Sequence, residues 1–207
     1  MKRLYIHLKI FFIALSLNAC ASPISVQSYD FGALRPNQNV AQNVTPNTSP
    51  IQFTLAEIRV PLSLDGNAMH YRLAYNNTQE LRPYANSRWG ISPAQLLETA
   101  IKQQLTEAGA VIVNSSDGVK DIPILKIELE KFEQIFSSVD SSEVQVQFRA
   151  SLIHQNHLLG QKNFRQNYRC TSADAKGGAQ AMPLAIEAML MELNTWLRLQ
   201  VDKHKVH

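Results

Sequence analysis

Side chains able to do chemistry are few in this 207-residue sequence. His154 and His157 stand three residues apart. That spacing would suit a metal site only if a turn lay between them, because residues three apart on a strand point to opposite faces. No Cys, His or acidic cluster stands beside them in sequence to complete a ligand set. We therefore interpret the pair as the tip of a hairpin and predict no metal ion.

Other candidates for catalysis are equally isolated. Cys170 has only Arg169 beside it to lower its pKa, so we interpret it as a half-buried structural cysteine. Gly177 and Gly178 form a doublet near a helix start, which is more typical of a loop than of a nucleotide-binding cradle. No Gly-x-Ser-x-Gly elbow occurs. The sequence predicts no enzyme and no cofactor, while a lipid-anchored hydrolase with a scattered site stays open as an alternative.

The first twenty residues have the three parts of a secretory signal. Lys2 and Arg3 begin it, an apolar stretch at 10–15 follows, and Leu17-Asn18-Ala19-Cys20 closes it. The apolar stretch is too short to cross a bilayer as a helix. The closing tetrapeptide resembles a bacterial lipobox, in which the cysteine is lipidated and becomes the new N-terminus. Residues 1–19 are therefore predicted to be a lipoprotein signal peptide, with Cys20 as the lipidation site that carries palmitate-type chains.

Lipidation of Cys20 would fasten the chain to a membrane, since several acyl chains on one residue bind stably whereas one binds marginally. Ala21 stands where lipoproteins kept in the inner membrane commonly have Asp. By that resemblance we expect a lipid anchor on the periplasmic face of the outer membrane. The alternative is an ordinary cleaved signal with a chance cysteine nearby.

Charge excludes one large class of partner. Three of the 20 basic residues precede Cys20 and none of the 17 acidic residues does, so the mature chain is neutral. A neutral chain has no global field that would attract nucleic acid, and we predict no nucleic-acid partner.

Periodicity divides the mature chain into a tether and a folded domain. Residues 20–50 would carry the lipid anchor, a short strand at 26–32 and an Asn/Gln/Pro-rich loop. Residues 51–207 would form the domain. Within it, strands are predicted at 51–60, 69–75, 80–84, 110–113, 125–129, 143–152 and 158–168, and helices at 92–109 and 179–199.

The helix signals and the strand order together predict the fold. Ser92, Pro93 and Gln95 give the first helix an N-cap, a first-turn proline and a capping box. In the second helix, Pro183 lies within the first turns and would mark the true start. Strands mostly in hairpin order with two helices predict an α+β fold, a two-layer sandwich of a mostly antiparallel sheet with both helices packed on one face. Polar side chains would cover the other face.

One group of candidate partner-binding residues lies on the strand that begins near residue 125. The core positions of this strand are odd, whereas Phe132, Gln134 and Phe136 are even. An unbroken register would project these three away from the core, as at an interface. Replacing both phenylalanines by Ala would then weaken association at little cost in stability. The alternative is a bulge near Lys131 that returns all three to the core.

A second candidate group precedes the first helix and consists of Tyr84, Arg88 and Trp89. Tyr, Arg and Trp are the side chains that are over-represented at binding hot spots. The structural alternative, which we favour for Trp89 and not for Arg88, is that the side chain closes the end of the core.

Several segments, taken in order, resemble the ABC-type transport auxiliary lipoproteins of the PqiC/YmbA kind. The resemblance spans nearly the whole mature chain, and the lipobox agrees with it. Departures are the long loop after Leu34 and Gly90, where the family often shows Ala. The matching segments are 60–66, 69–73, 81–89, 93–97 and 129–136, followed by a C-terminal helix that ends in Trp196-Leu197.

The resemblance implies a non-catalytic docking component of an MCE-linked lipid transport system. Members accompany transporters in which an ATPase and a permease work with MCE-domain proteins to move lipids between the two envelope membranes. The lipoprotein would sit on the outer membrane and contact the MCE-domain partner, and some relatives form homo-oligomeric rings. An outer-membrane assembly lipoprotein, a chaperone or scaffold for another envelope complex, remains an alternative.

Substituting Cys20→Ser removes the predicted acylation site, so we expect the protein to leave the membrane fraction. Density-gradient separation of the envelope, followed by immunoblotting, measures this. Cys170→Ser keeps the anchor cysteine and is the matched control, which should sediment with the outer membrane as the wild type does. Continued sedimentation of Cys20→Ser with the outer membrane would refute the anchor.

Overall fold

The computed structural model describes residues 25–32, 34, 50–114 and 117–204. The predicted signal peptide, Cys20 and nearly all of the Asn/Gln/Pro-rich loop lie outside the described residues. No described helix combines the length and the apolar character that a bilayer crossing requires. The elements are β1 (Gln27–Tyr29), β2 (Gln52–Leu55), a 3-10 helix η1 (Leu62–Leu64), β3 (Ala68–Leu73), β4 (Arg82–Trp89), α3 (Pro93–Glu107), β5 (Val111–Val113), β6 (Ile124–Phe136), β7 (Ser142–His154), β8 (His157–Arg169) and α4 (Ala175–His204).

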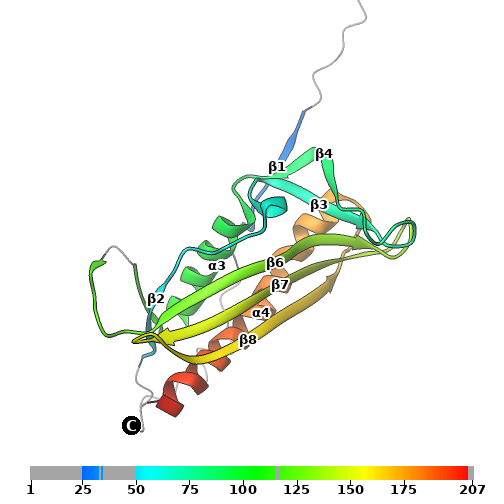
Figure 1. The fold of residues 1–207 in the computed structure, drawn as a ribbon. Coiled ribbons are helices and arrows are strands. Elements are labelled where there is room, and N and C mark those ends of the chain that lie inside the picture. The colour runs from blue at the N-terminus through cyan, green and yellow to red at the C-terminus, as the bar shows by residue number, and fades with distance from the viewer. Residues whose placement is uncertain (1–24, 33, 35–49, 115–116, 205–207) are drawn as a thin grey trace, which may run out of the picture.

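The strands form one mixed, mostly antiparallel sheet that is organised around β6 (Figure 1). On one edge of β6, β7 and then β8 add antiparallel along nearly their whole lengths. The other edge is shared, since the first residues of β6 pair with β2 and the last with β3, both in parallel. β5 extends the sheet parallel to β2, while β4 pairs antiparallel with β3 and β1 parallel with β4. The predicted α+β class is confirmed, with parallel pairs that hairpin order did not foresee.

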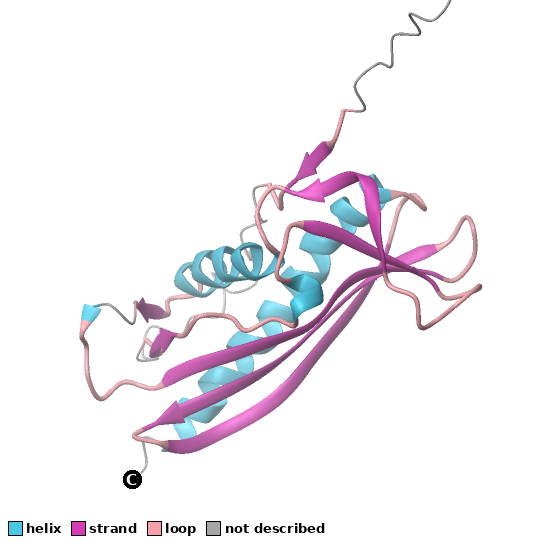
Figure 2. Ribbon diagram, turned by 45° about the horizontal axis from the view of Figure 1, so that its top comes forward, coloured by secondary structure: helices cyan, strands magenta, loops and turns pink. Residues whose placement is uncertain are grey.

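Both helices cover the same face of the sheet, as predicted (Figure 2). The 30 residues of α4 give a length of about 45 Å. The 13-residue strands β7 and β8 are about 43 Å long, so α4 packs along the full hairpin. The apolar stripe of α3, which includes Leu97 and Ile101, is buried beside it. The predicted two-layer arrangement is confirmed.

The two helix starts differ in how well the sequence predicted them. For α3 the capping box is present, since Ser92 Oγ accepts from the Gln95 backbone N–H at 3.3 Å and Gln95 Oε1 accepts from the Ser92 N–H at 3.1 Å. For α4 the prediction of a start at Pro183 is wrong. The helix begins two turns earlier, after Asp174, whose Oδ1 accepts from the Gly177 N–H at 2.7 Å. Packing against β7 and β8 holds Pro183 inside the helix, although proline lacks the N–H that an interior position uses.

A bulge in β6 decides which of its side chains face the helices. The register between β6 and β7 shifts between Leu129 and Lys131, which moves the core positions from odd to even. Phe132, Gln134 and Phe136 are consequently only 2%, 3% and 7% exposed. The interpretation that these three project away from the core is wrong, and the alternative of a bulge near Lys131 is confirmed.

We expect Phe132→Ala to lower the free energy of unfolding by about 3–5 kcal/mol, the usual cost of emptying a buried aromatic site. Urea unfolding followed by circular dichroism measures the change. Val139→Ala is the matched control, because Val139 is 74% exposed at the β6–β7 turn and its truncation should cost less than about 0.5 kcal/mol. Equal stabilities of Phe132→Ala and the wild type would contradict the core assignment.

Candidate functional site

The six residues predicted to contact a partner lie together where β4 and β6 meet β1 and β3. Trp89 is buried, as the structural interpretation predicts, and the side chains of Phe132, Gln134 and Phe136 are buried with it. Tyr84 is half-buried, and Arg88 is the exposed member of the set. Most of these residues therefore form an internal junction between the strands.

An aromatic cluster occupies the part of this junction nearest to β1. The Trp89 and Phe132 rings meet edge to face with centroids 5.4 Å apart. Phe31, two residues after β1, places its ring 6.0 Å from Trp89 and 6.3 Å from Phe132. Leu34 follows and is buried in the core. Trp89 and Phe132, two of the aromatic residues predicted to bind a partner, thus contact the segment that follows β1.

A second cluster joins β3, β4 and β6. Tyr71 lies 4.5 Å from Tyr84 and 5.9 Å from Phe136 between ring centroids. Burial raises the pKa of Tyr84 above its ordinary value, which favours the protonated hydroxyl. That hydroxyl donates to Oε1 of Gln134 at 3.0 Å.

The side-chain amide of Gln134 connects four elements. Besides accepting from Tyr84 on β4, it donates through Nε2 to Ser142 Oγ on β7 at 2.8 Å. The same Nε2 donates to the backbone carbonyl of Asp174, just before α4, at 3.1 Å. Both ends of the buried amide are thus satisfied, which removes the cost of burying it.

Helix α4 approaches this amide so closely that only glycine fits. A Cβ added to Gly178 would lie 2.2 Å from Gln134 Oε1, and one added to Gly177 would lie 2.1 Å from the backbone oxygen of Ser172. The interpretation of the Gly177-Gly178 doublet as loop is therefore wrong, because both residues lie in the first turn of α4. Gly178 lets the start of the helix pack on β6, and Gly177 lets it pack on the loop residue Ser172.

The comparisons with known proteins identify this architecture. The family model of the ABC-type transport auxiliary lipoprotein component matches residues 33–193. The chain belongs to this family. The match runs from before β2 into α4, and it includes Trp89, Phe132, Gln134 and Gly178.

Solved structures agree on the fold. The DUF330 protein XCC0632 from Xanthomonas campestris is 17% identical, with a TM-score of 0.71 over 88% of this chain and 100% of that chain. An uncharacterized protein is 15% identical, with a TM-score of 0.57 over 84% of this chain and 97% of that chain. At these identities the likeness establishes the fold alone. No curated protein matches this chain in sequence.

In this auxiliary lipoprotein the titratable groups suited to catalysis are dispersed. Cys170 is half-buried, as predicted, and burial raises the pKa of its thiol, which opposes formation of a nucleophilic thiolate. His154 and His157 pair across the tip of the β7–β8 hairpin, as predicted. Within the described part of the chain, no three His, Cys, Asp or Glu side chains gather as a metal ion would need.

Sequence reasoning missed one buried charge, that of Glu133. Its side chain is only 4% exposed, and Oε2 accepts from Arg72 Nη2 at 2.8 Å and from Arg72 Nε at 3.2 Å. Lys131 Nζ lies 3.8 Å from Oε1. His70 pairs in register with Glu133, and burial lowers the pKa of His70 more than the carboxylate raises it. The parallel pairing of β3 with β6 creates this cluster, and no local sequence signal announces that pairing.

Because Gly178 contacts Gln134, the effect of Gly178→Ala on stability should depend on whether Gln134 is present. Inside a helix, alanine is more favourable than glycine by about 1 kcal/mol. Forcing an extra methyl group into a packed core costs about 1–3 kcal/mol. We therefore expect Gly178→Ala to destabilise the wild type in urea unfolding, and to stabilise the Gln134→Ala background, where the overlapping oxygen is gone. Gly66→Ala, with no atom within 4 Å of its added Cβ, is the control and should be nearly neutral. The same change in stability in both backgrounds would show that the contact is unimportant.

Proposed function

We propose that this auxiliary lipoprotein is anchored in the outer membrane by lipid on Cys20 and faces the periplasm. There it would serve as a non-catalytic docking component of an MCE-linked lipid transport system. The observation that carries the proposal is the family match over residues 33–193, which assigns the chain to ABC-type transport. The lipobox at Leu17-Asn18-Ala19-Cys20 supplies the anchor that the family description requires.

The N-terminal segment supports a domain held close to its membrane. Six residues separate Cys20 from Gln27, the first residue of β1, and they reach at most about 20 Å when fully extended. Gln27 pairs with Ser87, and Phe31 packs on Trp89 shortly afterwards. A lipid on Cys20 would therefore keep the β1 end of the domain near the bilayer surface.

The opposite end of the sheet would then face into the periplasm. The β7–β8 hairpin tip and the C-terminal end of α4 lie at the end of the molecule away from β1 (Figure 1). A partner that extends from the inner membrane would meet that end and the polar sheet face first. Arg88 lies beside β1, in register with Ser28, and we assign it to contacts between neighbouring copies in a ring at the membrane-proximal end.

Crosslinking in intact envelopes, affinity purification of the full chain and mass spectrometry test the proposal. We expect an MCE-domain protein to be enriched with the wild type and lost with Cys20→Ser, because the unanchored domain is no longer held at the outer membrane. Crosslinked copies of the chain itself should decrease with Arg88→Glu, and not with Lys102→Glu on the exposed side of α3. Recovery of an outer-membrane barrel without an MCE-domain protein would favour the assembly-lipoprotein alternative and overturn the proposal.

A further inference from the structure

The sheet face away from the helices is polar over most of β6, β7 and β8. Its side chains pair with one another across the strands, as Arg149 does with Glu128 and as Gln147 does with Glu130 at 2.7 Å. On the next pair of strands, Gln161 donates to Ser151 at 2.8 Å. Polar groups that satisfy one another in this way leave a well-solvated surface.

At the end away from β1, the same face becomes apolar. Thr54 on β2 is in register with Ile124 on β6, and Ile124 is in register with Ile153 on β7. The three side chains therefore stand side by side across three strands. Ile124 is exposed and Ile153 half-buried, although both lie where the face is otherwise polar. Ile124 and Ile153 together give this end of the polar face a small apolar strip, which an apolar ligand could cover.

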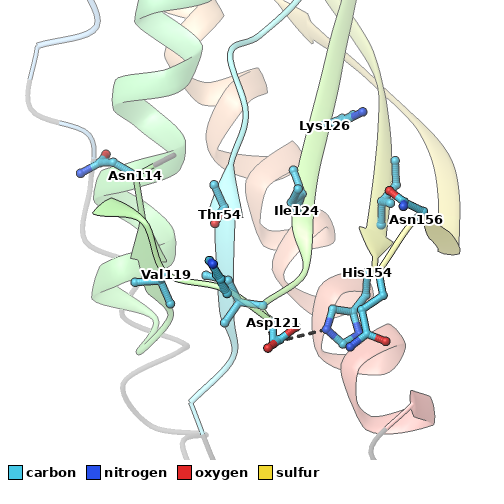
Figure 3. Close-up of a pocket in the computed structure, with 12 residues that line it drawn as sticks. Thr54, Asn114, Val119, Asp121, Ile124, Lys126, His154 and Asn156 are labelled. Carbon is cyan, nitrogen blue, oxygen red and sulfur yellow. Dashed lines mark hydrogen bonds between the residues drawn. The ribbon is translucent and has the colours of Figure 1, made fainter. Parts of the chain in front are cut away.

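Two walls turn this row into a hollow of about 420 Å³. Figure 3 shows Val119 and Asn114 on one side and His154 and Asn156 on the other, with Thr54 and Ile124 between them. His154 Nε2 lies 3.2 Å from the backbone oxygen of Asp121, which ties the two walls together at the bottom. The volume falls within the range of about 300–1,000 Å³ that is usual for small-molecule sites.

The rim of the hollow is positively charged. Lys120 and Lys126 are exposed there, and Asp121 contributes the one carboxylate among the described residues that line it. Ile122 and Val119 add apolar surface to that of the isoleucine row. The lining therefore suits a ligand with an apolar body and an anionic end.

The geometry points to a binding site for a single-chain anionic amphiphile. Its alkyl chain would lie on Ile124 and Ile153, and its carboxylate or phosphate would meet Lys120 and Lys126. Burial of its methylenes against the isoleucines supplies most of the affinity, and the lysines select the anionic end. This assignment does not depend on the proposed docking role, because the site would bind its ligand with or without a protein partner.

The test uses membranes that contain the full chain and a palmitic acid probe with a diazirine on its chain and an alkyne at its end. After irradiation, we expect label on peptides that cover 119–126 and 151–156. Ile124→Thr with Ile153→Thr should lower that labelling about tenfold, which corresponds to the loss of a few buried methyl groups. Threonine keeps the β-branch at both strand positions, and urea unfolding confirms that the variant is folded. Val139→Thr, at the other end of the sheet, is the matched control and should label as the wild type does.

Competitors and charge variants identify the anionic end. Lys120→Gln with Lys126→Gln should lower labelling severalfold, whereas Lys102→Gln on α3 should not. Palmitate and lysophosphatidic acid should compete strongly, and hexadecanol should compete severalfold more weakly because it has the alkyl chain without the charge. The stronger of the two anionic competitors shows whether a fatty acid or a phosphate-headed lipid is preferred. Labelling that is insensitive to both pairs of substitutions would overturn the site. A photoreactive residue can also be placed at Asn156. If it crosslinks only to a protein and the wild type takes no palmitate label, the occupant is a peptide and the proposed lipid ligand is wrong.

Discussion

The buried side-chain amide of Gln134 is the contact on which the arrangement of the domain depends. It joins Tyr84 of β4, Ser142 of β7 and the backbone of Asp174 at the start of α4. An amide buried without partners costs several kcal/mol, so any alternative register of these elements that breaks the contacts is strongly disfavoured. Gly178 completes the constraint, since its missing side chain lets α4 reach β6. One polar group therefore fixes how helix and sheet are aligned.

Features encoded within a few residues could be predicted from the sequence. The capping box of α3 needs only Ser92 and Gln95, and the structure contains both of its hydrogen bonds. The alternation of β7 from Val144 to Leu152 buries the even residues as predicted, although Gln145 is buried as well. The polar strand β8 is an edge strand, as its composition indicates, because it pairs with β7 alone among the described strands. In these cases local propensity and tertiary packing favour the same structure.

Features that depend on distant segments could not be predicted in the same way. Arg72 and Glu133 are 61 residues apart, and only the parallel pairing of β3 with β6 brings them together. Pro183 indicates a helix start locally, yet packing on the hairpin extends α4 to Ala175. For the bulge, the sequence offered two registers of similar merit, and the contacts of Phe132 and Gln134 with other elements decide between them. The interpretation that Phe132, Gln134 and Phe136 project away from the core was wrong for that reason.

The bulge also explains how one strand can serve both ends of the molecule. Before it, the even residues of β6 face away from the helices, which exposes Ile124 and Lys126 to the hollow. After it, the even residues face inward, which gives Phe132 to the aromatic cluster of Trp89 and Gln134 to its buried contacts. A strand of 13 residues with strict alternation would keep one parity throughout, and could supply either the hollow or the junction near β1, but not both. The inserted residue thus separates two regions of one strand, which is about 43 Å long. At one end lies the internal junction that holds the N-terminal segment, and at the other end lies the open surface of the hollow.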